Sequence, residues 1–280
     1  MPFTFLSNAT ETLPTVINSR QPAVFRGLAH DWPAIARWRF EYLAALDPQR
    51  EVQLVVGNRE GGATQFMKSR LGCYLNELCQ AAQSNFYSVA NDLPYLKEFD
   101  LLRHFPELLN DVRPTALFPP RSVGVNSSWI GPANARTGLH YDLLDNIAVQ
   151  IRGRKRFYLL APGSIEAIDA VSAKYDAWAK LSNVDAAIGL RLNEAHTEKP
   201  LKNQAFQVEL EPGDVLYIPA GWWHEVVNLT PCILLSGFFG PRWTVNRRWL
   251  QVQYQMFVHR LHRYLSKTKL PCTCHSQTAP

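Results

Sequence analysis

Between residues 122 and 239 the chain is a succession of short segments with β-strand character, and turn residues separate each segment from the next. We expect eight strands, at 122–130, 138–142, 146–152, 156–161, 205–210, 214–219, 223–229 and 232–239. Pro-Gly-Asp at 212–214 and Pro-Ala-Gly at 219–221 supply sharp corners. Eight strands in two sheets are the number in a jelly roll, so this region predicts a double-stranded β-helix barrel.

The rest of the sequence predicts additions to that barrel. Apolar residues recur with helical spacing at 40–46 and 71–82, while 51–56 and 86–89 have the composition of strands. A proline-rich break at 113–120 closes this part, and 280 residues are enough for one large core with attached segments. The sequence therefore predicts a mainly β fold with α additions. Its expected parts are a mixed α/β segment over 1–120 packing on the barrel, the barrel over 121–240 with a polar, partly helical insertion at 162–204, and a basic helix and tail over 241–280.

The composition indicates a soluble protein of a reducing compartment. No uncharged apolar run approaches the roughly 18 residues of a membrane-spanning helix, and the first residues lack the features of a signal peptide. The five cysteines are odd in number and show no framework spacing, which argues against structural disulfides. We expect a cytoplasmic protein that does not bind membranes.

The C-terminal segment 241–280 carries seven Lys or Arg residues and no acidic residue. An apolar stripe with helical spacing runs along its first part: Leu250, Tyr254, Phe257, Val258, Leu261 and Leu265. The favoured interpretation is a helix that packs on the barrel or on a twin subunit, with a solvated basic face, ahead of a nucleic-acid role. The closing Cys272-Thr-Cys274-His275 contains metal-ligand side chains, but a tail rich in Pro, Ser and Thr is more typical of disorder.

The segment Thr137-Gly-Leu-His140-Tyr-Asp142 carries candidate metal ligands. Residues two apart in a strand point to the same face, so His140 and Asp142 can share one ion. A second histidine would complete the two-histidine, one-carboxylate set of non-haem Fe(II) oxygenases. His224 is the best candidate, because it follows the turn at 219–221 and begins a strand. A lone His-x-Asp is a common tripeptide, and the strand context around 213–224 is what favours the metal interpretation.

Oxygenases with this ligand set need a co-substrate that supplies electrons. One such compound, 2-oxoglutarate, has a distal carboxylate that must be neutralised inside a partly dry barrel. The basic run from Arg152 to Arg156 offers four candidates for this role, and the residues alone do not choose among them.

Several motifs together resemble one known family over nearly the whole chain. They are Arg26-Gly-Leu-Ala-His-Asp-Trp32-Pro33, Phe86-Tyr87, His140-Tyr-Asp142 with Asn146, Gly153-Arg-Lys155-Arg, and Gly213-Asp214 to Pro219 leading to His224. The chain resembles the Jumonji-C, or cupin-like, Fe(II)/2-oxoglutarate-dependent oxygenases. The segment 140–146 and Phe105-Pro-Glu-Leu-Leu are similar to the tRNA wybutosine-synthesising hydroxylase, and the layout is similar to the asparaginyl hydroxylase acting on hypoxia-inducible factor. On the final strand, Ser236 stands near where the asparaginyl enzyme has an asparagine.

The resemblance implies a role for each matching residue. It implies iron ligation by His140, Asp142 and His224, and binding of the distal carboxylate of 2-oxoglutarate by Lys155 and Thr137. Further co-substrate contacts implied by it are Tyr87, Asn146 and Ser236.

The resemblance also implies a reaction that uses Fe(II), 2-oxoglutarate and O2. Oxidative decarboxylation of 2-oxoglutarate to succinate and CO2 would be coupled to hydroxylation of a C–H bond. A protein or peptide side chain is the first expectation for the substrate. The alternatives are a modified tRNA nucleotide, reached through the basic C-terminal segment, and a small metabolite. A barrel that only binds is the alternative of another class, whereas a sugar-isomerase-type cupin needs more histidines and a glutamate in the first motif. Family C-terminal helices also suggest a homodimer.

Overall fold

The structure, a computed structural model, describes residues 4–5, 8, 11–84, 94–165, 170–184, 205–266 and 270–276. It confirms the eight expected strands as β6 (Ser122–Gly131), β7 (Arg136–Asp142), β8 (Asp145–Arg152), β9 (Lys155–Leu160), β11 (Ala205–Leu210), β12 (Val215–Ile218), β13 (Trp223–Asn228) and β14 (Cys232–Pro241). Their bounds differ from the sequence-based ranges by two residues or fewer, the usual uncertainty at strand ends.

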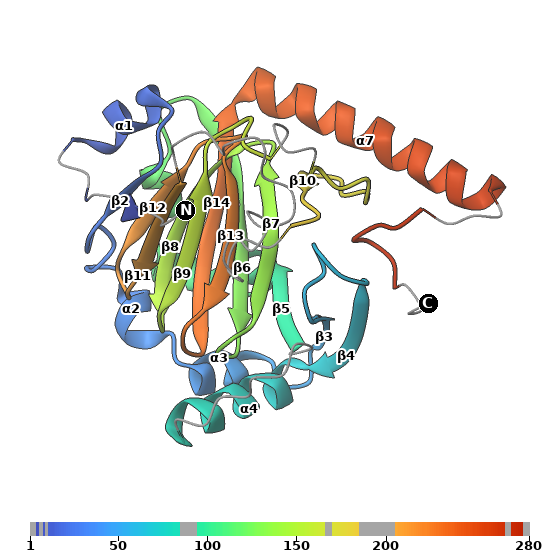
Figure 1. The fold of residues 1–280 in the computed structure, drawn as a ribbon. Helices are drawn as coiled ribbons and strands as arrows, with labels where there is room; N and C mark the ends of the chain where they lie inside the picture. The colour runs from blue at the N-terminus through green and yellow to red at the C-terminus, as the bar shows by residue number, and fades with distance from the viewer. Residues whose placement is uncertain are drawn as a thin grey trace.

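These strands form two antiparallel four-stranded layers (Figure 1). One layer has the order β11-β9-β13-β7, and the other has the order β12-β8-β14-β6. Because neighbours within a layer are not consecutive in the sequence, the chain crosses between the layers, as a jelly roll requires. The sequence-based fold class is confirmed.

The space between the two layers is filled by alternate side chains from both. Phe157 and Leu159 of β9 and Val226 of β13 meet Ala148 of β8 and Leu234 of β14 in one buried cluster. Intervening residues such as Val149 and Leu235 point to the outer face of the second layer and join a separate core there. This alternation identifies the side chains that point into the barrel. The functional side chains must be among them.

The N-terminal half supplies that outer core and extends both sheets. Strands β2 (Ala23–Phe25), β5 (Pro94–Phe99), β3 (Glu51–Val56) and β4 (Gln65–Arg70) complete an 8-stranded sheet, and β1 (Thr4–Phe5) and β10 (Ala179–Leu181) complete a 6-stranded one. The helices and 3-10 turns of this half are α1 (Leu13–Ser19), α2 (Pro33–Arg37), α3 (Phe40–Leu46), α4 (Leu71–Ser84), α5 (Leu101–His104), Pro106–Asn110 and Pro114–Leu117. The elements expected at 40–46, 51–56 and 71–82 are confirmed, whereas the strand expected at 86–89 lies outside the described residues.

Helix α7 (Arg242–Leu265) confirms the expected C-terminal helix, but it does not pack its apolar stripe on the barrel. Its buried residues are Val252 and His259, whereas Tyr254 and Phe257 expose 69% and 62% of their surface. Figure 1 shows α7 running outward from the end of β14 and the chain then turning back. The interpretation that the stripe packs on the barrel is therefore wrong, and packing on a twin subunit stays a prediction.

Residues 270–276 return to the body of the protein and contact residues near Tyr175. The expectation of a disordered tail is wrong for this part, because main-chain hydrogen bonds fix it in place. Within the insertion, the described residues 162–165 and 170–184 contain β10 and no helix. None of the described helices has the combination of length and apolar character that crossing a bilayer requires.

Candidate active site

Pairing between β7 and β13 brings the three predicted metal ligands together. His140 lies directly opposite His224 in the antiparallel register, and their ring centroids are 4.2 Å apart. Asp142 Oδ1 lies 3.9 Å from His140 Nε2, and Asp142 Oδ2 lies 3.5 Å from His224 Nε2. One ligand atom from each side chain falls within 4.8 Å of the other two. Tyr141 points away and packs edge-on against Trp223, as strand alternation predicts.

Both imidazoles are oriented by their own backbone. His140 Nδ1 is 2.7 Å from the carbonyl oxygen of Gly138, and His224 Nδ1 is 3.0 Å from that of Trp222. A carbonyl oxygen can only accept, so each Nδ1 carries the proton and donates it. Each Nε2 therefore keeps its lone pair and faces Asp142. Fixing the tautomer in this way is typical of histidines that ligate metals.

Burial sets the protonation of these three groups. It lowers the pKa of His140, with help from the neighbouring His224, and it lowers the pKa of His224 to about 4. Burial also raises the pKa of Asp142 to about 6, against the opposing effect of the His140 imidazole. At neutral pH both histidines are neutral and Asp142 is a carboxylate, which are the forms that ligate a cation.

The residues fit a divalent cation. Asp142 Oδ2 is buried and accepts no hydrogen bond from the described residues, an arrangement that is costly unless something else binds the oxygen. The two neutral nitrogens and one carboxylate form the two-histidine, one-carboxylate set that suits Fe(II).

A β-bulge places Thr137 beside this set. On β13, His224 and Val226 are two residues apart, while their partners on β7, His140 and Thr137, are three apart. The extra residue in β7 turns Thr137 to the same side as His140, which strand parity alone would forbid. Thr137 is buried and lines the same cavity as His140 and Asp142.

Lys155 lies inside the barrel, with 1% of its surface exposed. Its Nζ donates a hydrogen bond of 2.9 Å to Tyr95 Oη, and among the described residues it has no salt bridge. Burial lowers the pKa of Lys155 to about 8. The other members of the basic run do not share this position, since Arg152 and Arg156 are partly exposed and Arg154 is exposed. The structure thus separates Lys155 from its three neighbours, which the sequence alone did not.

Tyr95 of β5 was missed by sequence reasoning. Besides accepting from Lys155, its ring packs edge-on toward Trp129 at 6.4 Å and fits against Gly131, where an added Cβ would lie 2.4 Å from the ring. The sequence analysis identified no strand at 94–99, and no local pattern there indicated a contact with Lys155. Tyr87, the tyrosine that the resemblance implied, lies outside the described residues.

Asn146 and Ser236 reach the barrel interior from the opposite layer. Asn146 shares the face of Ala148 on β8, and Ser236 of β14 pairs directly with Ala148. Both residues are buried, and Asn146 Oδ1 accepts no hydrogen bond from the described residues. The structure therefore brings Asn146, Ser236, Thr137 and Lys155 to the same interior as the metal ligands.

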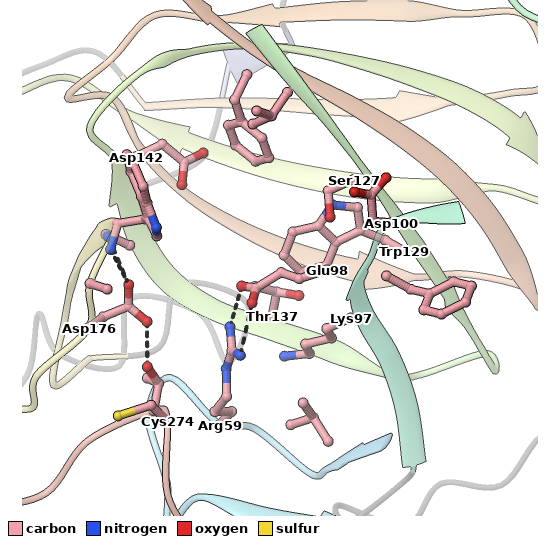
Figure 2. A pocket seen from close by; sticks show the side chains of 18 of the residues that line it. Arg59, Lys97, Glu98, Asp100, Ser127, Trp129, Thr137, Asp142, Asp176 and Cys274 are labelled. Carbon is pink, nitrogen blue, oxygen red and sulfur yellow. Dashed lines mark hydrogen bonds and ion pairs between the residues drawn. The ribbon is translucent and has the colours of Figure 1, made fainter. Parts of the chain in front are cut away.

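A charge network, buried except at Glu98 and also missed by the sequence analysis, supports the bulge in β7. Lys97 Nζ lies 2.8 Å from Glu60 Oε2, and Arg59 lies 2.6 Å from Glu98 (Figure 2). Burial would raise the pKa of Glu60, but Lys97 and Arg59 hold it well below its usual range. Glu60 Oε2 also accepts a 3.1 Å hydrogen bond from the amide of Gly138. The network thus connects the 58–60 turn to the strand that carries two metal ligands.

Two of the three proposed metal ligands, His140 and Asp142, line a cavity of about 800 Å³. Figure 2 shows Asp142 and Thr137 facing this cavity across from Trp129, with the Arg59–Glu98 pair at its side. The cavity extends to Trp249 of α7. Trp129 and Phe238 line it, whereas Trp223 and Phe239 belong to the hydrophobic cores, so the aromatic residues of the barrel divide between site and core.

Comparison with known proteins adds an independent observation. A family model described as a cupin-like domain matches residues 9–244. Jumonji C domain-containing protein 5 of Drosophila melanogaster is 26% identical over 77% of this chain and 54% of its own length. HSPB1-associated protein 1 of Homo sapiens is 25% identical over 77% of this chain and 47% of its own length. tRNA wybutosine-synthesizing protein 5 of Gallus gallus is 25% identical, with 81% and 73% covered. The chain spans about half the length of the first two relatives.

Proposed function

Because this chain belongs to the cupin-like (Jumonji-C) family, whose members are typically Fe(II)/2-oxoglutarate oxygenases, we propose that it hydroxylates a C–H bond with these cofactors and O2. The observation that carries this proposal is the convergence of His140, Asp142 and His224 within 4.8 Å, with both Nε2 lone pairs facing the carboxylate. Fe(II) bound by these residues would supply, together with 2-oxoglutarate and O2, an oxidant strong enough to hydroxylate a C–H bond.

We further propose that Lys155 binds the distal carboxylate of 2-oxoglutarate. A buried ammonium group with no acidic partner among the described residues is costly by itself, and an incoming carboxylate would compensate its charge. Tyr95 Oη orients this lysine, and Thr137 offers a hydroxyl on the same face as the metal ligands. The co-substrate would then lie between the lysine and the metal.

Asn146 and Ser236 complete this proposed co-substrate site from the opposite layer. The lack of a hydrogen-bond partner for Asn146 Oδ1 supports a polar ligand nearby. Tyr87 stays a prediction for this site, since it lies outside the described residues, and Tyr95 is added to the set because of its contact with Lys155.

The first choice of substrate is a protein or peptide side chain. A cavity of about 800 Å³ exceeds what a five-carbon diacid fills, so there is room for a second molecule beside the metal. Charged pairs line one wall, and Trp178 and Trp249 line the part near the helix α7. Such a mixture of aromatic and charged surface suits a peptide backbone with one inserted side chain.

A modified tRNA nucleotide is the second candidate. Two observations favour it: α7 is basic and reaches the cavity through Val245 and Trp249, and one relative is named a tRNA wybutosine-synthesizing protein. Retention of RNA that falls steeply as salt rises would support the nucleotide, because contacts to phosphates release counterions. Absence of RNA binding even at low salt would remove it.

We also propose that the exposed apolar stripe of α7 forms a homodimer. Its residues expose 44–70% of their surface, and a contiguous exposed apolar patch of this kind marks an interaction site. A second copy of α7 offers the same stripe and can cover it by two-fold symmetry.

One experiment tests the enzyme proposal against its rivals. Fe(II)-loaded protein is incubated with fractionated lysate, with or without 2-oxoglutarate, and digests of protein and RNA are searched for the mass of one added oxygen. A gain that requires 2-oxoglutarate and is absent with Asp142→Ala is the expected result. If the added oxygen appears in the protein digest or in the RNA digest, that digest identifies the substrate class. A search for the same added mass among small molecules of these fractions tests the metabolite alternative. If correctly folded, iron-loaded protein forms no succinate and no oxygen adduct, the result indicates a barrel that only binds.

A further inference from the structure

A second cluster of metal-ligating side chains lies where the end of the chain meets α7. It shares no residue with the proposed iron site, the triad of His140, Asp142 and His224. It consists of His259, Cys272, Cys274 and His275, whose ligand atoms all lie within 4.8 Å of one another. His259 is buried on α7, and the other three belong to the returning segment 270–276. In Figure 1 this segment turns back from the far end of α7 toward the barrel. We propose that these four residues bind one zinc ion.

The distances match tetrahedral coordination. Cys274 Sγ lies 3.5 Å from His259 Nε2 and 3.1 Å from His275 Nδ1, and Cys272 Sγ lies 3.3 Å from His275 Nδ1. With Zn–S near 2.3 Å and Zn–N near 2.0 Å, neighbouring sulfur and nitrogen ligands of a tetrahedral zinc are about 3.5 Å apart. The side chains therefore need only small adjustments to surround one ion.

The donor atoms select a different metal from the one at the triad. Two thiolates and two imidazoles are a soft-to-borderline set, which favours zinc in a closed tetrahedral site. The triad offers no sulfur and only three protein ligands, which suits Fe(II) with open positions. The chain would thus hold a structural zinc beside a catalytic iron.

Neighbouring residues hold the ligands in place. The Tyr175 ring stacks on the His259 ring with centroids 4.2 Å apart, and Tyr175 forms a parallel bridge with Cys272. Its amide donates to Pro271 O, and its carbonyl accepts from the amide of Thr273. Thr64 Oγ1 donates a 2.6 Å hydrogen bond to Cys272 O. Contacts to ligand side chains and their backbone are what keeps a metal site preorganised.

The position of the cluster gives the zinc a consequence for the cavity. Thr273 and Cys274 line the same cavity as the metal ligand Asp142, and Figure 2 shows Asp176 between Asp142 and Cys274. Thr273 Oγ1 donates to Asp176 Oδ2, so the segment 270–276 is part of one cavity wall. Zinc would fix that wall to the end of α7, and its removal would loosen the entrance without disturbing the barrel.

The test counts zinc in purified protein by mass spectrometry of the elements. An His140→Ala, Asp142→Ala background removes the triad, so that remaining zinc reports on the second cluster alone. About one zinc per chain is expected there, and Cys272→Ser with Cys274→Ser should abolish it. Matched controls are Cys73→Ser, an exposed cysteine of α4, and His262→Ala, an exposed histidine beside His259 on α7; both should keep the zinc. A background protein without zinc, or one whose zinc survives the serine substitutions, overturns the proposal.

Three measurements on the unaltered wild-type protein guard against misfolded variants. Cobalt substitution should produce a near-ultraviolet thiolate-to-cobalt absorption, and a spectrum without that absorption contradicts thiolate ligation. Removing zinc with a chelator should speed tryptic cleavage after Arg260 or Arg263 by about tenfold while the barrel stays intact. An intact mass lighter by two hydrogens, which indicates a Cys272–Cys274 disulfide in place of the metal, also overturns the proposal. None of these results depends on whether the triad is catalytic.

Discussion

At the scale of single residues, burial explains the protonation states of the triad His140, Asp142 and His224. It also explains why the loss of any one of these residues is costly. His140, Asp142 and His224 have little contact with water, and each is in the protonation state that a cation requires. Removing one of them leaves the other two buried without the ion that would compensate them. Lys155 is also a buried charged group, but its charge is positive. The partner that we expect to compensate it is the distal carboxylate of 2-oxoglutarate and not a side chain.

His140→Ala and Asp142→Ala are each expected to lower 2-oxoglutarate-dependent succinate formation by more than about a hundredfold. Even residues that only orient metal ligands contribute about 10–100-fold, and these two are ligands themselves. Succinate is measured under saturating 2-oxoglutarate with circular dichroism to verify folding. His262→Ala, which alters an exposed histidine of α7, should turn over like wild type. Normal turnover by a folded Asp142→Ala protein would show that the ligand assignment is wrong.

Lys155→Ala should weaken 2-oxoglutarate binding by at least about 30-fold, because losing one partner of a buried charge pair costs about 2–5 kcal/mol. Tyr95→Phe should weaken it about fivefold, since it removes one neutral hydrogen bond worth about 1 kcal/mol. Calorimetry of the Fe(II)-loaded protein measures both effects, and iron affinity should stay unchanged. Lys180→Ala, at an exposed lysine of β10, is the control. Equal affinity of Lys155→Ala and wild type would remove the lysine from the co-substrate site.

The pH dependence of 2-oxoglutarate affinity follows from the same lysine. Only the protonated amine pairs with the carboxylate, and burial lowers the pKa of Lys155 to about 8 in the ligand-free protein. Below that pH the amine is already charged, so the dissociation constant should be flat. Above it, binding must take up a proton, and the constant should rise about tenfold per pH unit. Lys155→Met should bind weakly without this rise; a wild-type constant that stays flat to about pH 9.5 would contradict the assignment.

At the scale of elements, the bulge in β7 decides which side chains the metal site can use. It places Thr137 on the face of His140 and exposes the Gly138 amide to Glu60. The bulge is tight, because a Cβ on Gly138 would lie 2.5 Å from Asn58 Oδ1 and 3.0 Å from Glu60 Cβ. An alanine at position 138 would therefore force the Asn58 side chain to shift and would crowd Glu60.

Gly138→Ala should destabilise the protein by about 1–3 kcal/mol and weaken Fe(II) binding, since the new Cβ displaces the Asn58 side chain and presses on Glu60, which binds the residue 138 amide. Chemical denaturation and anaerobic iron titration measure the two effects. Gly240→Ala, on β14 of the opposite layer, is the matched control, because its new Cβ would meet Val245 at an ordinary 3.5 Å. Iron affinity that is unaffected by Gly138→Ala would show that the bulge is not what positions the ligands.

At the scale of the whole molecule, α7 stands apart from the barrel along much of its length (Figure 1). Most of its apolar stripe faces outward, yet its last turns hold His259 against the returning segment 270–276. The helix thus connects three proposed properties: the dimer surface along its length, the zinc cluster near its end, and the cavity wall near its start.

The wild-type protein is expected to be a dimer at micromolar concentration, with twice the mass of the chain by light scattering. Tyr254→Asp combined with Leu261→Asp should give a monomer with an unchanged circular dichroism spectrum, because charges would be buried in the apolar stripe. Gln253→Asp, at an exposed position off the stripe, should remain dimeric. A monomer mass for the wild type would rule out the α7 dimer.

The sequence by itself determined the eight barrel strands, the C-terminal helix and the candidate triad. These follow from local rules: alternation along strands, turn residues between them, and the parity that pairs His140 with Asp142. The resemblance added Thr137 and the choice of Lys155, which strand parity and the basic run had not provided.

Only the tertiary structure decided the contacts between residues far apart in the chain. Thr137 shares the face of His140 through a bulge. Lys155 pairs with no acidic residue in the described part of the chain, and Tyr95 accepts its hydrogen bond. His259 joins Cys272, Cys274 and His275 only because the chain reverses after α7. None of these four residues predicts a metal site from its sequence neighbours alone, but together they form one cluster. The physical reason is that periodicity reports which face a side chain occupies, while register, bulges and chain reversal determine what that face meets.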